Sequence, residues 1–243
     1  VFLSSPFSIK ALNILLKLNI PAIKIASGEV NNRFLINEII KARKPIILSC
    51  GMSSSKETDQ LVKFFKKKKI KICLLHCSSS YPNPLKNIGI GMLNYYKKKY
   101  KISVGLSDHS GNYLTGLSAI SLGADLLEVH VVKSKKNLGF DTSSSITFKE
   151  LKILSEFRNF YEKYYNLKIN KKIDKKIKNM RKLFFRSLAL KKSMRKGDKI
   201  LLRDLTLKKP GTGINFNEMK KIIGKSLIKD KNAKDLINWS DFE

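Results

Sequence analysis

The chain has 243 residues, of which 42% are hydrophobic and 28% are charged, and this length suffices for one large domain or for one large and one small domain. No apolar run reaches the roughly 18 residues of a membrane span, and the N-terminus lacks the basic-then-apolar order of a signal peptide, so no membrane partner is expected. The cysteines, Cys50, Cys73 and Cys77, lie in strand-like runs without a standard zinc spacing and are expected to be buried free thiols in a reducing cytoplasm.

The net charge of +30 and the high isoelectric point suggest a nucleic-acid partner at first sight. Only seven of the 49 basic residues are arginine, however, and a protein that reads nucleic acid usually favours the bidentate fork of arginine. The lysines cluster on the predicted outer faces of helices. A solvated basic surface is therefore the favoured interpretation, and a nucleic-acid partner is unlikely on this reading.

Six strand-like apolar runs, each followed by a helix-like segment, occupy the chain up to residue 165. The expected strands are residues 1–5, 22–27, 45–50, 71–78, 102–108 and 125–132. The expected helices are residues 8–19, 32–42, 55–68, 93–100 and 112–123, and a longer one that starts with a capping box formed by Thr147 and Glu150. This alternation predicts an α/β fold with a parallel sheet covered on both faces. A doubly wound sheet and a (β/α)₈ TIM barrel that lacks its first two βα units fit the pattern equally well.

The pattern changes after residue 165. Residues 166–183 form a lysine-rich linker, and residues 184–243 contain short β-like runs interrupted by Gly197, Pro210, Gly211 and Gly213. The expected domains are thus residues 1–165, the linker 166–183, and a small, mostly-β domain over residues 184–243.

Polar side chains gather at the C-terminal ends of the expected strands. The residues concerned include Ser4, Ser5, Lys24, Ser27, Glu29, Ser49, Ser78, Ser79, Tyr81, Ser107, Asp108, His109, Glu128 and His130. Parallel α/β sheets bind ligands at this edge, and buried polar groups are costly unless they have partners. The sequence therefore predicts a ligand site here.

Two chemistries fit this edge. His109 and His130 end consecutive strands, so their imidazoles could bind one divalent metal and leave open positions, although spacing alone does not decide between a metal site and capping groups. Lys24 among hydroxyl groups suits a phosphate or a carboxylate. His76 and Asp108 are expected to be structural, Asp108 because strand alternation turns it to the other face.

Six motifs resemble, in order, those of the sialic acid synthase family. They are IPAIKIASGEVNN, PIILSCGMSS, LLHCSSSYPNP, VGLSDHSG, LGADLLEVHVV and KKPGTGI. The resemblance implies a TIM barrel followed by an antifreeze-like SAF domain. It also implies an enzyme that joins phosphoenolpyruvate to an N-acetylated hexose, such as N-acetylmannosamine, and releases a nine-carbon acid and phosphate.

The resemblance also implies roles for individual residues. His109 and His130 match the metal ligands, for Mn²⁺ or Mg²⁺. The substrate-binding residues that it implies are Ser5, Lys24, Ser27, Ser49, Ser79, Tyr81, Ser107 and Lys209. Glu29 and Asp141 match catalytic positions near the sugar or the metal-bound water. In the family, the segment containing Lys209 reaches the partner's active site in a domain-swapped homodimer.

Three departures from the family pattern matter. Phe140 and Thr142 stand where the family often has proline and histidine, which makes a diacetamido hexose a possible substrate. Lys209 stands where arginine is common; it keeps the positive charge but cannot make the two parallel hydrogen bonds of a guanidinium. The first two βα units are absent from this sequence, which predicts a barrel with an open wall and little activity. A non-catalytic relative that only binds sugar or phosphate is therefore the main alternative, ahead of a basic nucleic-acid-binding protein.

Overall fold

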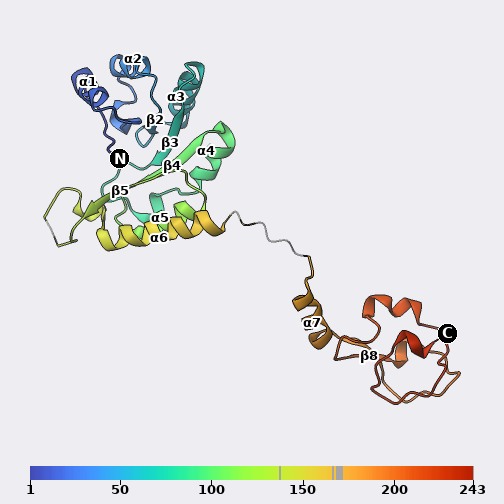
Figure 1. Ribbon diagram of the computed structural model, residues 1–243. Coiled ribbons are helices and arrows are strands. Elements are labelled where there is room, and N and C mark those ends of the chain that lie inside the picture. The colour runs from blue at the N-terminus through green and yellow to red at the C-terminus, as the bar shows by residue number, and fades with distance from the viewer. Residues whose placement is uncertain (137, 166, 168–171, 243) are drawn as a thin grey trace. The chain divides into compact units, whose positions relative to one another are not determined.

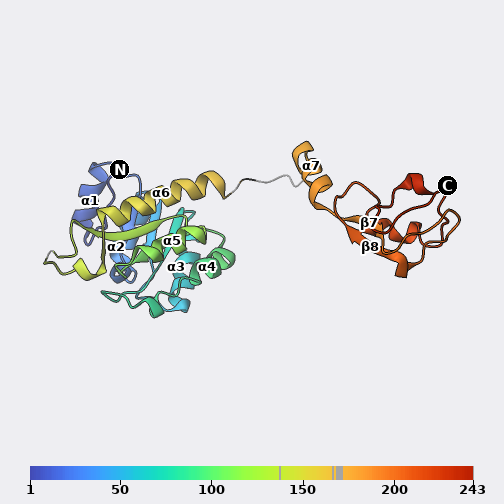
Figure 2. The same ribbon diagram turned by 90° about the horizontal axis from the view of Figure 1, so that it is seen from below.

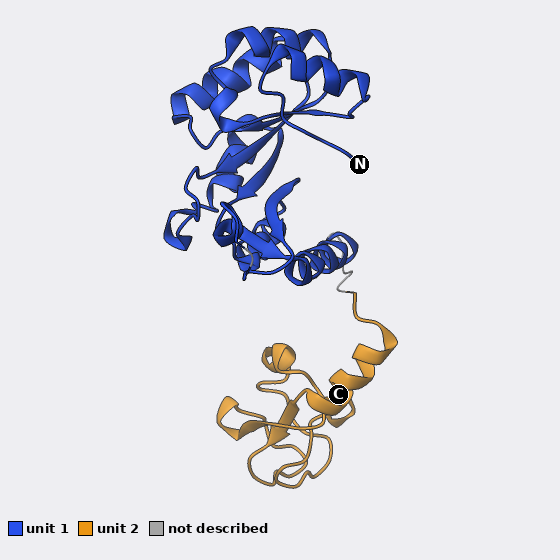
Figure 3. Cartoon of the chain, turned by 90° about the vertical axis from the view of Figure 1, so that its left-hand side faces the viewer, with its two compact units in different colours: residues 1–167 blue, residues 168–243 orange. Residues whose placement is uncertain are grey.

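The structure is a computed structural model that describes residues 1–136, 138–165, 167 and 172–242 (Figure 1). The chain forms two compact units, residues 1–167 and residues 168–243 (Figure 3). Each unit has its own hydrophobic core.

The first unit contains a six-stranded sheet in which every pair of neighbouring strands is parallel. The strands are β1 (Ile23–Ile25), β2 (Ile46–Ser49), β3 (Ile72–Cys77), β4 (Ser103–Asp108), β5 (Leu127–Val132) and β6 (Ser145–Thr147). Their order in the sheet is their order in the chain. A doubly wound sheet reverses its strand order at a switch point, so the consecutive order identifies the wall of a curled β/α barrel.

Helices follow one another around the outside of this sheet (Figures 1 and 2). They are α1 (Ile9–Lys17), α2 (Arg33–Lys41), α3 (Ser55–Lys67), α4 (Met92–Tyr100), α5 (Tyr113–Ser121) and α6 (Phe148–Tyr164). The predicted capping box of α6 is present, because Thr147 Oγ1 accepts the Glu150 N–H and Glu150 accepts the Thr147 N–H. Apolar residues such as Leu61 and Phe65 of α3 pack into the core between helices and sheet.

Two expectations about strands were wrong. Residues 1–5 form no strand; their described contact with the sheet is one backbone bond, from Lys24 N–H to the Ser4 carbonyl at 3.4 Å. Strand β6 was not predicted, because its three residues, directly before α6, are too few to show an alternating pattern. Between β5 and β6 the described residues form the short 3₁₀ helix η3 (Thr142–Ser144) and no α-helix, although parallel strands are usually joined through one.

The second unit contains α7 (Lys175–Phe184) and an antiparallel pair, β7 (Ser187–Leu190) and β8 (Leu205–Lys208). Short 3₁₀ turns and isolated bridges complete it around Leu188, Ile200 and Ile237. The small, mostly-β domain is confirmed. The predicted linker falls partly on residues 166 and 168–171, outside the described residues, and α7 occupies much of the remainder. In the parts of the chain that the structure describes, every helix is too short or too polar to traverse a bilayer.

Candidate active site

A cavity of about 450 Å³ opens at the C-terminal ends of β1 to β5. The sequence-predicted residues in its wall are Lys24, Ser27, Ser49, Ser79, Tyr81, Ser107, His109 and His130. They come from five successive strands or the turns after them, because the carboxyl ends of parallel strands meet at one edge. The predicted convergence of these residues is therefore present in the structure.

An ion pair crosses the interior of the curled sheet at the floor of this cavity. Lys24 Nζ on β1 lies 2.6 and 2.8 Å from the two carboxylate oxygens of Glu128 on β5. The side chains are 14% and 40% exposed. Burial disfavours the carboxylate, but the charge and hydrogen bonds of Lys24 outweigh burial and hold the pKa of Glu128 below its ordinary value. The Glu128 carboxylate is therefore ionised at neutral pH.

The hydrogen bonds of His109 determine which of its nitrogens faces the cavity. Nδ1 lies 3.0 Å from the Ser78 carbonyl, which can only accept, so Nδ1 carries the proton of the neutral ring. The lone pair of Nε2 is then directed at the Tyr81 hydroxyl, at 3.2 Å, and lies 3.5 Å from Ser107 Oγ. Burial disfavours the imidazolium, but the groups that accept from Nδ1 raise the pKa of His109 above its ordinary value.

His130 faces His109 from the neighbouring strand. The two ring centroids are 5.2 Å apart, and Tyr81 packs against both rings. His130 Nδ1 lies 3.7 Å from a carboxylate oxygen of Asp141. This arrangement fits a divalent metal held by two imidazoles, each with an acceptor group behind it, as metal-ligating histidines commonly have.

The fit is limited to two protein ligands. In the described ranges, no group of three or more histidine, cysteine, aspartate or glutamate side chains is arranged to hold a metal ion. The remaining coordination positions would belong to water or substrate, as in catalytic metal sites.

The serines form the opposite side of the cavity. Ser49 is 2% exposed, and its buried Oγ has no hydrogen-bond partner among the described residues. Ser27 Oγ accepts the Gly51 N–H at 3.0 Å. A Cβ on Gly51 would lie 2.6 Å from Ser79 Oγ, so only glycine lets the chain pass this close. An unpartnered buried hydroxyl in the same cavity wall as a lysine suits an anionic ligand.

Four predicted site residues lie outside the cavity wall. Ser5 belongs to the irregular N-terminal segment, and Glu29 accepts a hydrogen bond from Asn32 Nδ2 at 2.8 Å before α2. Asp141 lies beside His130, as described above. Lys209 belongs to the second unit, where its Nζ lies 5.4 Å from the centre of the Phe184 ring. The catalytic and substrate roles of these four residues remain predictions.

Two residues with clear contacts in the site were not assigned a role from the sequence. The sequence placed Glu128 only among the polar residues at the strand ends, and its bond to Lys24 depends on the curl of the sheet. Cys77 was expected as a buried thiol. It is buried, and its sulfur lies in the cavity wall. Strand alternation on β3 was the available signal, because it turns Cys77 inward and His76 outward.

The two residues expected to be structural have side-chain partners outside the cavity, although Asp108 itself also forms part of the cavity wall. His76 Nε2 lies 2.7 Å from the Ile88 carbonyl. The Asp108 carboxylate accepts from Thr115 Oγ1 at 2.5 Å and from Ser110 Oγ at 2.8 Å, which holds the turn into α5.

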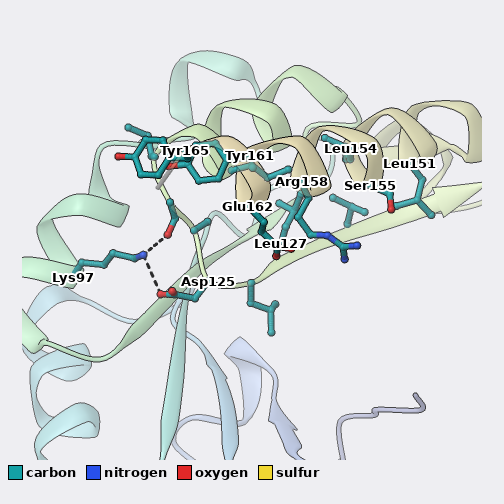
Figure 4. A pocket seen from close by; sticks show the side chains of 16 residues that line it. Lys97, Asp125, Leu127, Leu151, Leu154, Ser155, Arg158, Tyr161, Glu162 and Tyr165 are labelled. Carbon is teal, nitrogen blue, oxygen red and sulfur yellow. Dashed lines mark hydrogen bonds and ion pairs between the residues drawn. The ribbon is translucent and has the colours of Figure 1, made fainter. Parts of the chain in front are cut away.

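A larger cavity, of about 1000 Å³, lies on the other face of β5. Figure 4 shows its lining side chains between α6 and β5. Apolar residues such as Leu127 and Leu154 line it, and two of its charged residues, Lys97 and Asp125, pair at 3.1 Å. It contains none of the predicted site residues, so the smaller cavity is the candidate active site.

Comparisons with known proteins show what the two units resemble. Residues 1–168 match the NeuB family, and residues 185–243 match the SAF domain. The chain is 32% identical over 239 residues to the N,N'-diacetyllegionaminic acid synthase of Campylobacter jejuni, covering 97% of this chain and 71% of that protein. It is 29% identical over 241 residues to a pseudaminic acid synthase of the same species, covering 99% and 70%. The crystal structure of the N-acetylneuraminic acid (sialic acid) synthetase of Leptospira borgpetersenii, in complex with citrate, matches with a TM-score of 0.66 at 31% identity, over 72% of this chain and 62% of that one.

Proposed function

The chain belongs to the NeuB family and carries a SAF domain, and we propose that it condenses phosphoenolpyruvate with an N-acylated amino sugar and water to give a nonulosonic acid and phosphate. The observation that carries the proposal is that Lys24 and the unpartnered Ser49 hydroxyl line the same cavity as His109 and His130. A phosphate and an aldehyde could thus be held side by side.

The residues suit the steps of this condensation. Carbon 3 of phosphoenolpyruvate bonds to the aldehyde carbon of the sugar, water adds at carbon 2, and phosphate leaves with cleavage of its C–O bond. Lys24 and the hydroxyls of Ser27, Ser49 and Ser79 would bind the phosphate and carboxylate and hold their negative charge through these steps. The Tyr81 hydroxyl, at 3.2 Å from His109 Nε2, is placed to orient the sugar oxygen.

His109 and His130 would hold a Mn²⁺ or Mg²⁺ ion. When bound, the ion supplies Lewis-acid polarisation of the sugar carbonyl. The acceptors at the two Nδ1 atoms, the Ser78 carbonyl and the Asp141 carboxylate, would keep the Nε2 atoms of the rings available to it.

For the sugar we propose N-acetylmannosamine or a diacetamido-dideoxy hexose. The named relatives that support the second class are the legionaminic and pseudaminic acid synthases. Phe140, which is exposed, and Thr142, which is half-buried, flank Asp141 and differ from the pattern of sialic acid synthases, which also favours the second class. From the resemblance of the segment around Lys209 we further propose a homodimer, and light scattering of the purified chain tests this oligomeric state. From the free cysteines we propose that the protein acts in the cytoplasm.

The proposed function is tested by phosphate release. We expect release from phosphoenolpyruvate with one of these sugars in Mn²⁺ buffer, and a His109→Gln variant should lower kcat/KM roughly hundredfold or more. His76→Gln is the matched control, because that ring faces away from the cavity. No phosphate release with any of the sugars would refute the proposal. Phosphoenolpyruvate binding without turnover would favour the non-catalytic binding protein instead.

A further inference from the structure

Cys77 occupies the junction between the serine side and the histidine side of the candidate active site. It is the last residue of β3, is 8% exposed, and lines the cavity. Its Sγ lies 3.9 Å from His109 Nδ1 and 3.9 Å from Ser27 Oγ. These partners follow β4 and β1, so one sulfur atom contacts both sides of the cavity.

The directions of these hydrogen bonds make the sulfur an acceptor in both. His109 Nδ1 carries a proton, because the Ser78 carbonyl beside it can only accept a hydrogen bond. A protonated Nδ1 is a donor, so Cys77 Sγ accepts from it as well. Ser27 Oγ already accepts the Gly51 N–H, and its own proton is directed at the sulfur. The bond to the sulfur and the Gly51 N–H together hold the Ser27 side chain in place at the cavity wall.

The backbone at Gly51 provides the space for this sulfur. A Cβ at residue 51 would lie 2.7 Å from Cys77 Sγ. The C–S bond is longer than a C–O bond, so the oxygen of a serine at position 77 would fall short of both partners. The site thus contains a sulfur atom at a place where a hydroxyl could not make the same contacts.

We propose that Cys77 is a positioning residue that holds the Ser27 side chain at the cavity wall and holds the His109 ring in place; this inference deepens the proposed function and rests on it for the identity of the anion. Cys77 acts through these two side chains and need not touch the substrate. Its removal should therefore affect anion binding and the His109 ring together while the fold persists.

The test is a pair of variants, Cys77→Ser and Cys77→Ala, in the full chain. The protein has three histidines, so the ring ¹⁵N resonances in a two-dimensional spectrum assign readily by His→Gln variants. We expect the His109 resonances to move or broaden in both variants while those of His76 stay in place, which also reports that β3 is folded. Calorimetry should show phosphoenolpyruvate binding about three- to tenfold weaker, the loss expected for one net hydrogen bond.

The matched control is Cys73→Ser, on the same strand and the same face but at the opposite end of β3. It should leave both readouts unchanged. Wild-type His109 resonances and wild-type phosphoenolpyruvate affinity in folded Cys77→Ser and Cys77→Ala would overturn the inference. If the wild-type chain does not bind phosphoenolpyruvate at all, the proposed function fails, and the histidine spectrum alone still decides whether Cys77 positions His109.

Discussion

Removal of the Lys24–Glu128 ion pair should destabilise the first unit, because this pair joins two strands that do not neighbour each other in the sheet. Lys24 is on β1 and Glu128 is on β5, and both carboxylate oxygens are bonded to the ammonium. The pair therefore holds the sheet in its curled form. The perturbation is a double-mutant cycle with Lys24→Met, Glu128→Gln and the combined variant.

The expected coupling energy follows from the burial of the pair. Exposed ion pairs contribute about 0–1 kcal/mol, whereas removing one partner of a buried pair costs about 3–5 kcal/mol. Lys24 is 14% and Glu128 40% exposed, so we expect roughly 2 kcal/mol for the pair. For a unit of this size, a loss of that magnitude lowers the melting temperature by roughly 4–8 °C.

Urea unfolding with two probes measures this energy. The single tryptophan, Trp239, lies in the second unit, so its fluorescence should not change between variants. The far-UV circular dichroism signal comes mainly from the helices of the first unit and should shift to lower urea. The pKa of Glu128 is lowered on folding, so the stabilisation is present above the unfolded-state value of about 4.3 and is lost as the pH falls through the folded-state pKa. A coupling energy near zero at pH 7, or a Lys24→Met variant as stable as the wild type, would refute the reasoning.

Three further perturbations have defined outcomes. Gly51→Ala would place a Cβ 2.6 Å from Ser79 Oγ, so it should lower kcat/KM at least about tenfold in the phosphate-release assay. Gly91→Ala, with open space around its Cβ and a position outside the cavity wall, should retain activity; equal activities would contradict the close approach at residue 51. Asp241→Asn leaves its buried partner Lys231 without a counter-charge and should destabilise the second unit by about 3 kcal/mol, measured by the Trp239 fluorescence transition in urea. Thr147→Ala removes the cap of α6 and should cost about 1 kcal/mol in the dichroism transition, an effect that the sequence motif alone already predicts; no measurable cost would show that α6 does not need this cap.

The local features of the fold followed from the sequence because they depend on neighbouring residues. The capping box at Thr147 and the apolar runs of β2 to β5 are examples. The choice between a doubly wound sheet and a barrel wall remained open, because both have the same local pattern and differ only in which strands pair. The consecutive strand order in the structure settled that choice.

The same limit applies to the site. Alternation placed Ser107 and His109 on the inner face of β4, and both line the cavity. The partner of Lys24 could not be found in this way, because Glu128 is 104 residues away and reaches Lys24 only when the sheet curls. The contact of Cys77 with Ser27 likewise depends on how close Gly51, which follows β2, comes to the end of β3.

β5 differs from the other central strands in how little of it is covered. All six of its residues are partly exposed, whereas all four residues of β2 are buried. Its side chains alternate between the candidate active site and the larger cavity beside α6, and the described residues between β5 and β6 place no α-helix over its outer face. The strand that carries Glu128 and His130 thus stays accessible to solvent. The proposed condensation consumes one water molecule per turnover, and the partial exposure of this strand lets solvent reach the part of the cavity wall that carries Glu128 and His130.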